Sequence, residues 1–150
     1  MGMLRLLLTW PNHAPQADST CGGALVLAAL NGHEAAVRLL LTWPDHAPPA
    51  DSQGGSALIG AAREGHAAIV RLLLEWPHNA PRADSDHGGA LLDAAVKGHT
   101  EVVRLLLTWP HHAPLADSLT GRKALAAAVK KGHREIVRLL TMQPNVRCHA

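Results

Sequence analysis

Histidine is the residue type in this sequence with the most obvious chemical potential, because its imidazole binds metals and transfers protons near neutral pH. Eleven histidines occur in 150 residues, and most recur at a fixed interval. Stacked copies of one unit would separate equivalent side chains by about 8–10 Å, whereas zinc needs ligand atoms about 2 Å away. No carboxylate or cysteine completes a ligand set, so a structural role is favoured and no cofactor is indicated. The recurring sets are His33, His66, His99 and His133, and His13, His46, Asn79 and His112, with His78 and His111 beside the second set.

Arginine recurs at the same interval and could form a basic stripe that follows the phosphates of a polyanion. Glutamates stand three or four residues before several of these arginines, a spacing that places acid and base on one helical face. A solvated face with internal ion pairs is therefore favoured over a nucleic-acid site. The arginines are Arg5, Arg38, Arg71, Arg104 and Arg138, and the glutamates are Glu34, Glu101 and Glu135.

Tryptophan is the most distinctive recurring residue, with each copy 33 residues after the last. The indoles could offer a ladder of aromatic faces to a ligand, or they could pack between neighbouring units. Packing is favoured, because an identical residue in every unit suits contact between identical units better than recognition of an irregular partner. The column consists of Trp10, Trp43, Trp76 and Trp109.

The sequence offers no catalytic arrangement. Cys21, Ser19 and His13 are close in sequence but fall in a loop, and no other unit repeats the cysteine. The sequence also lacks a glycine-rich loop after a strand and an HExxH motif. These observations predict a protein that is not an enzyme.

A repeated unit of two helices must position the recurring histidines, arginines and tryptophans. The Gly-His pairs at Gly32, Gly65, Gly98 and Gly132 step by 33, 33 and 34 residues, and such a period indicates a solenoid. We expect a short inner helix over residues 24–30, a turn at Gly32 and an outer helix over about 34–43 that ends before Pro44. A long loop that contains proline and glycine follows, with Gly54-Gly55 leading into the next inner helix.

We expect one domain over residues 1–150, built from about nine helices. Its opening half-unit would span 1–15, its four full units about 16–48, 49–81, 82–114 and 115–143, and its tail 144–150. The core must consist of Leu, Val, Ile and Ala, because the chain has no Phe or Tyr.

The composition sets limits on partners and location. A net charge of +2 is too small to indicate a nucleic-acid or membrane partner. No apolar run reaches the roughly 18 residues of a membrane span, and the N-terminus lacks a signal-peptide pattern. Cys21 and Cys148 stand at opposite ends, so two free thiols in a reducing intracellular compartment are expected, cytoplasmic with the nucleus left open.

The pattern of helix, Gly-His turn, helix and long loop resembles the ankyrin repeat. In the second unit Asp51 and Gly54 match the family's loop residues, Ala57-Leu58 its Pro-Leu pair, Ala61-Ala62 its alanines and Gly65-His66 its Gly-His turn. The resemblance implies an all-α, ankyrin-like solenoid of helix–turn–helix units joined by long loops. Two departures stand out. The family's Thr and His of the Thr-Pro-Leu-His motif are replaced, so apolar packing must take over from their hydrogen bonds, and Trp-Pro with HAPxADS replaces the hairpin finger. The replacing residues are Gly23, Ser56, Gly89 and Lys123, and Val26, Ile59, Leu92 and Ala126.

The resemblance also implies binding of another protein through the inner helices and finger tips, without catalysis. Positions that differ between units fit that surface, so we expect the partner-binding residues among Gln16, Leu30, Asn31, Pro49, Arg63, Glu64, Arg82, Val96, Lys97, Leu115, Lys130 and Lys131. Two alternatives stay open. One is polyanion binding through the arginine column with Lys123, Lys130 and Lys131, and the other is a purely structural array, recently duplicated or designed. A weak homodimer through Leu4, Leu6, Leu7 and Leu8 of the opening half-unit is a further expectation.

Overall fold

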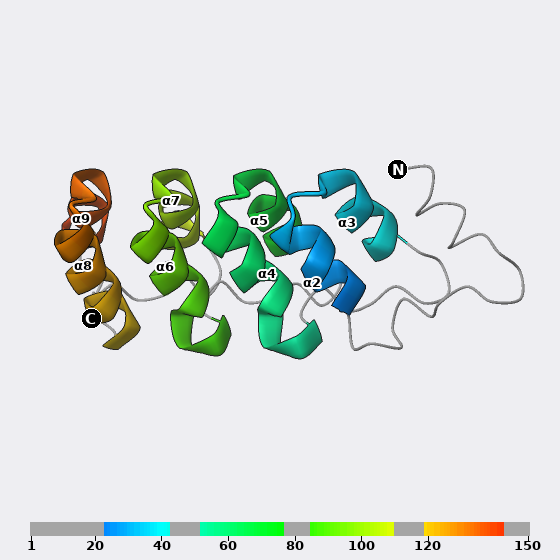
Figure 1. Cartoon of the computed structure of the whole chain (residues 1–150), viewed down its shortest axis with the longest axis horizontal. Helices are drawn as coiled ribbons and strands as arrows, with labels where there is room; N and C mark the ends of the chain where they lie inside the picture. Colours follow the sequence, from blue (N-terminus) through cyan, green and yellow to red (C-terminus); the bar gives the residue numbers. More distant parts are fainter. Residues whose placement is uncertain (1–22, 43–51, 77–84, 110–118, 143–150) are drawn as a thin grey trace, which may run out of the picture.

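A computed structural model describes residues 23–42, 52–76, 85–109 and 119–142 of the chain. These residues form eight helices and no strand, arranged as four consecutive pairs along one axis (Figure 1). The all-α solenoid predicted from the period is therefore confirmed. The helix expected in residues 1–15 and the finger loops lie outside the described residues. In chain order the helices are α2 (Gly23–Leu30), α3 (Glu34–Leu41), α4 (Ser52–Glu64), α5 (Ala67–Leu74), α6 (Ser85–Lys97), α7 (Thr100–Thr108), α8 (Leu119–Lys131) and α9 (Arg134–Thr141).

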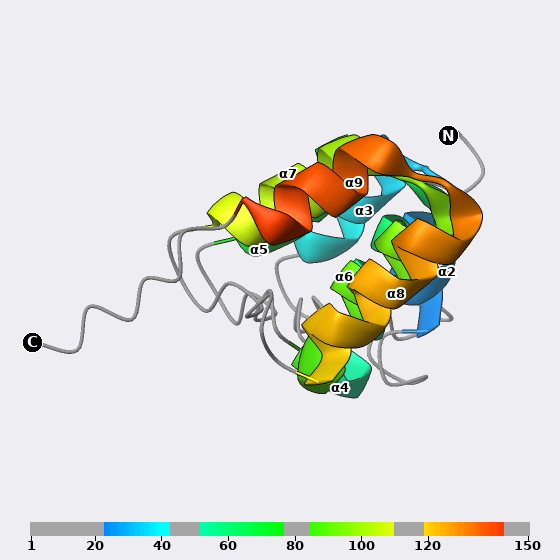
Figure 2. The ribbon, with the colours of Figure 1, turned by 90° about the vertical axis from the view of Figure 1, so that its left-hand side faces the viewer.

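The helices form two layers, which Figure 2 shows end-on. The inner layer contains α2, α4, α6 and α8, and the outer layer contains α3, α5, α7 and α9, with neighbours in each layer in contact. The core lies between the layers and between successive pairs. Leu58 of α4 and Val70 of α5 are completely buried there, as are their counterparts in the first and third pairs. Each pair therefore adds the same apolar cross-section to a continuous core.

Alanine sets the close approach of the inner helices. Ala29, Ala62 and Ala95 occupy equivalent places on α2, α4 and α6, and none of them has any solvent exposure. A side chain of one carbon leaves little space between neighbouring helix backbones, which lets the leucines beside it interlock. The buried hydrophobic residues of the described chain are Leu, Val, Ile and Ala, as the absence of Phe and Tyr from the sequence predicted.

Each inner helix turns into its outer helix at a Gly-His pair, as the sequence predicted. Gly32, Gly65, Gly98 and Gly132 have φ angles between 75° and 87°, a region that side-chain-bearing residues adopt only with strain. The backbone amide of the histidine that follows each glycine donates a hydrogen bond to a carbonyl of the inner helix, for example His66 N to Ala61 O at 2.8 Å. The chain thereby reverses direction with its helix-end carbonyls satisfied.

The outer helix ends earlier than predicted. The expected end near residue 43 is wrong, because α3 ends at Leu41 and Thr42 is its C-cap. The Thr42 hydroxyl donates to Arg38 O at 2.8 Å and the Thr42 amide donates to the same oxygen at 3.0 Å. The equivalent helix α5 also ends at Leu74, with Glu75 as its C-cap, so an end at this position does not require a threonine hydroxyl.

The inner helices of the last three pairs begin earlier than predicted. Residues 54 and 55 were expected in the loop, but α4 already begins at Ser52. The predicted change of direction is nevertheless present, because Gly55 has a φ of 82° and Gly88 of α6 has 86°. The turn before these glycines curls away from the helix axis in Figure 1. In α8 the corresponding residue is Arg122.

Candidate functional site

The solvent-facing side of the inner helices carries the side chains that differ most between units, and we call it the inner face. Positions three and four residues apart share one side of a helix. Leu30, Arg63, Val96 and Lys130 take equivalent places near the ends of the four helices. Leu30 and Val96 are partly exposed, whereas Arg63 and Lys130 are exposed. The structure therefore brings these four predicted residues into one row.

A second predicted row lies beside the first, at the C-terminal ends of the inner helices. Two of its members interact within their own unit. Asn31 Nδ2 donates to Leu27 O at 2.8 Å, and Glu64 Oε1 lies 3.8 Å from Arg63 Nε. The row consists of Asn31, Glu64, Lys97 and Lys131. The predicted finger residues Gln16, Pro49, Arg82 and Leu115 lie outside the described residues.

Histidines tie the units together directly behind these rows. His66 Nε2 lies 3.2 Å from Leu30 O, and His99 Nε2 lies 3.0 Å from Arg63 O. Because a carbonyl oxygen only accepts hydrogen bonds, Nε2 carries the proton in both rings. The predicted bracing role of this column is confirmed at these two histidines. Each bond holds the end of one inner helix against the next unit, so the inner face has a fixed geometry.

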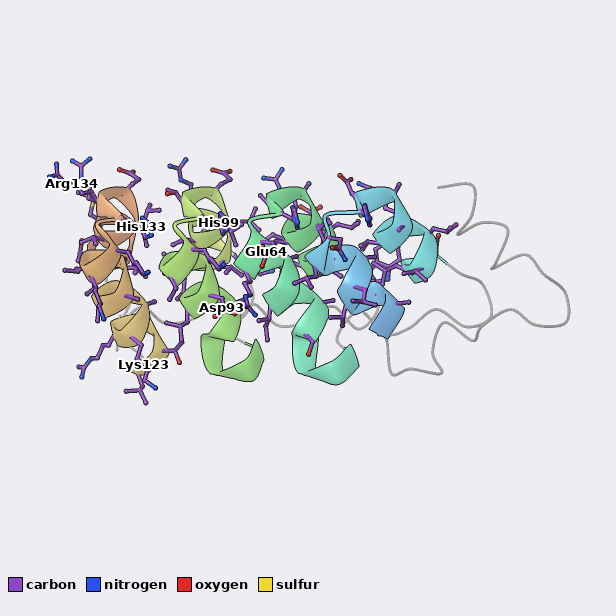
Figure 3. All side chains as sticks on the ribbon, in the orientation of Figure 1. Glu64, Asp93, His99, Lys123, His133 and Arg134 are labelled. Carbon is purple, nitrogen blue, oxygen red and sulfur yellow. The ribbon has the colours of Figure 1, made fainter. Side chains whose placement is uncertain are left out.

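Sequence reasoning missed one row of the inner face. Leu27, Gly60, Asp93 and Ala127 take equivalent places three residues before Leu30, Arg63, Val96 and Lys130. A β-carbon on Gly60 would lie 3.4 Å from Leu30 Cδ1, so Leu30 reaches across to α4. Figure 3 places Asp93 in the middle of α6, where it is partly exposed. The signal was available in the sequence, because these positions also differ between units and share a helical face with the predicted row.

The residues that replace the family's motif histidine have become apolar contacts. Val26, Ile59 and Leu92 are packed against the core and remain partly exposed on the inner face. This confirms the prediction that apolar packing takes over at these positions. It also places a row of apolar side chains beside the variable residues.

The arginine column lies on the outer helices and is only partly paired. Arg38 NH2 lies 3.0 Å from Glu34 Oε1, and Arg138 NH1 lies 3.8 Å from Glu135 Oε2. Arg104 makes no ion pair with a described residue, so the predicted pairing with Glu101 is wrong. A spacing of three residues allows such a pair, but the rotamers of two exposed side chains decide whether it forms.

Basic side chains concentrate in the last pair of helices. Residues 119–142 contain six of the fourteen Lys and Arg residues of the chain and one acidic residue, Glu135. Only Arg138 forms an ion pair there with a described residue. Figure 3 shows Lys123 and Arg134 extending outward from this pair. The basic residues without an ion pair among the described residues are Arg122, Lys123, Lys130, Lys131 and Arg134.

The described residues offer no group of three or more His, Cys, Asp or Glu side chains placed to hold a metal ion. The predicted second histidine column lies outside them. In the same part of the chain, none of the helices has the length and apolar character needed to cross a membrane.

Comparison with protein families agrees with the geometry. The family model described as ankyrin repeats (3 copies) matches residues 2–86 and 77–149. The chain belongs to the ankyrin-repeat family. Ankyrin repeats are generally non-catalytic modules for protein–protein interaction. Neither the search of curated proteins nor the search of solved structures returned a match to this ankyrin-repeat chain.

Proposed function

We propose that this chain is a non-catalytic scaffold that binds another protein through the inner face and the adjoining finger loops. The observation that carries the proposal is the contrast between the two kinds of position in each unit. Core positions such as Leu58 and Leu91 are identical and buried, whereas inner-face positions such as Arg63 and Val96 differ and are accessible. The constant residues form the core of the solenoid, and the variable residues can complement the surface of a partner protein.

The chemistry of the inner face supports a protein partner. Its first three units carry partly exposed Leu, Ile and Val side chains, whose burial against a partner is favourable. The histidine bonds between units hold these side chains in place before a partner arrives, so little ordering entropy is lost on binding. Because the two cysteines of the sequence are far apart along the chain, we infer that binding takes place in a reducing compartment such as the cytoplasm or nucleus.

Site-specific photo-crosslinking tests this proposal. A photoreactive amino acid at Arg63 or Lys97 on the inner face is compared with the same group at Arg71 or Arg104 on the outer helices. We expect the inner-face positions to give discrete crosslinked partners from cell extract and the outer positions to give none of them. Crosslinked species that are the same from both layers would contradict the proposal.

A further inference from the structure

The inner face changes its chemistry along the solenoid. On α2, α4 and α6 it carries an apolar strip, which we define as Val26, Leu30, Ile59, Leu92 and Val96. On α8 it carries a basic pole, which we define as Arg122, Lys123, Lys130 and Lys131. All members of the strip are partly exposed, and all members of the pole are exposed. The same three units also carry Arg63, Glu64, Asp93 and Lys97 on this face, and their two positive and two negative charges cancel. The face is therefore partly apolar without net charge over three units and positive over the fourth.

We propose that the inner face holds a protein segment that is apolar at one end and rich in Asp and Glu at the other. The acidic end lies over α8 and the apolar end over α2, α4 and α6. This inference rests on the proposed function and adds the composition and the direction of the bound segment.

Stabilisation of α8 does not explain why all four residues of the pole are basic. Lys130 and Lys131 lie in the last turn, where cations interact favourably with the helix dipole. Arg122 and Lys123 lie near the start of the helix, where cations interact unfavourably with the dipole and where the described part of α8 offers no acidic residue. The equivalent residues of α6 are Gly88 and Gly89, so the fold does not require a cation here.

The described residues supply no counter-charge to the pole. None of its four side chains forms an ion pair with a described residue. The acidic residues with described side chains on the packed elements are Asp93 of α6 and Glu135 of α9, and Glu135 pairs with Arg138. Like charges on one helix face repel one another. Carboxylates of a partner would remove that repulsion and form charge-assisted hydrogen bonds.

The apolar strip determines which class of polyanion can bind. A nucleic acid or a sulfated polysaccharide presents negative charge along its whole length. Over three units it would meet Leu, Ile and Val side chains and the mutually cancelling charges of Arg63, Glu64, Asp93 and Lys97. Asp93 stands within that part of the inner face and would repel a phosphate or sulfate chain. A peptide can place apolar residues over the strip and acidic residues over the pole. The observations therefore favour a protein segment.

The spacing of the helices sets the length of the segment. Four inner helices at about 8–10 Å span roughly 25–30 Å. A helical peptide of about 20 residues covers this distance. The test therefore uses a fluorescent synthetic peptide of about that length, with leucines at helical spacing in one half and a run of glutamates in the other.

The binding experiment follows fluorescence anisotropy with the full chain and three matched variants. Lys123→Glu/Lys130→Glu reverses the charge of the pole and should raise the Kd about tenfold or more. Leu92→Ser/Val96→Ser removes part of the strip and should also weaken binding. Arg71→Glu/Arg104→Glu makes the same charge change on the outer helices and should alter the Kd by less than about twofold. Circular dichroism checks that every variant is folded.

Two further probes define what would overturn the inference. A peptide of the same composition with leucines and glutamates evenly interleaved should bind more weakly, since it cannot match both ends of the surface. Equal affinity for that peptide, no effect of the pole reversal, or no binding of the first peptide would overturn the inference. Tighter binding of a heparin oligosaccharide or a single-stranded RNA at the same residues would overturn it as well. The crosslinking from Arg63 and Lys97 decides the proposed function separately.

Discussion

The imidazole of His99 fills the space over Gly65 of the preceding unit. A β-carbon on Gly65 would lie 2.5 Å from Nδ1 of that ring, closer than two such atoms can approach. The glycine and the histidine are therefore a matched pair, one without a side chain and the other with a flat ring. The same relationship holds for Gly32 with His66 and for Gly98 with His133, whereas no atom of a described residue lies within 4 Å of the equivalent position at Gly132.

Gly65→Ala should destabilise the protein more than Gly132→Ala. Both glycines have positive φ, 81° and 77°, so an alanine costs about 1–2 kcal/mol of backbone strain at either position. Only at Gly65 must the new methyl group also displace a ring, which adds about 1–3 kcal/mol. Urea unfolding of the two variants measures the difference. Equal losses of unfolding free energy in the two variants would show that the contact with His99 does not contribute to stability.

His99→Ala should reduce the free energy of unfolding by about 1 kcal/mol or somewhat more. The change removes the hydrogen bond to Arg63 O and leaves that carbonyl without its partner. In the double variant Gly65→Ala/His99→Ala the methyl group no longer meets a ring, so the combined loss should be smaller than the sum of the single losses. Strict additivity would contradict the packing described above.

These contacts show which parts of the structure the sequence could predict. The Gly-His period predicted the turns and the bracing histidines, because a positive φ and a close contact both require glycine. The exact ends of the helices were harder to predict from the sequence. Helix ends depend on hydrogen bonds of the terminal turns, such as Thr42 N to Arg38 O at 3.0 Å, which the apolar pattern does not encode.

The candidate surface was predictable only in part for a similar reason. Leu30, Arg63, Val96 and Lys130 were found because they differ between units. Asp93 was missed because it lies outside the variable pair of residues that ends each inner helix, although its row also differs between units. The lack of an Arg104 ion pair could not be foreseen, because spacing permits that pair and the conformations of two exposed side chains decide it.

Trp76→Ala should cost less than the replacement of a fully buried tryptophan. The sequence favoured packing for this column, and the indole of Trp76 packs against the core while remaining partly exposed. A buried tryptophan loses about 3–5 kcal/mol on truncation, so a loss of about 1–3 kcal/mol is expected here. Chemical unfolding gives the value. Unchanged stability together with loss of the crosslinked partner would instead support an aromatic ladder for binding.

Ala62→Val should destabilise the protein, whereas Val129→Ala should change little. The two residues occupy equivalent places on α4 and α8. Ala62 has 0% exposure between two inner helices, but Val129 is 60% exposed because no described helix follows α8. Two added carbons at Ala62 force neighbouring helices apart at a cost of about 1–3 kcal/mol. Val129→Ala should stay within about 0.5 kcal/mol. Melting temperatures of both variants provide the test, and a larger effect at Val129 would contradict the stacking.

Leu74→Thr and Thr141→Leu form the last pair of predictions. Leu41, Leu74 and Leu107 are buried near the ends of their outer helices, whereas the equivalent residue of α9 is Thr141, which is exposed. The Thr141 hydroxyl donates to Val137 O at 2.8 Å, so threonine satisfies a carbonyl at the end of α9.

Leu74→Thr should lose about 2–4 kcal/mol, because it removes buried carbon and introduces a hydroxyl into the core. Thr141→Leu should leave stability within about 0.5 kcal/mol, since no described helix covers that position. It should instead increase self-association, because a leucine there enlarges the apolar area next to Met142, which is 71% exposed. Urea unfolding and light scattering over a concentration series separate the two effects. A large gain in stability from Thr141→Leu in a monomeric protein would contradict the exposed position of Thr141.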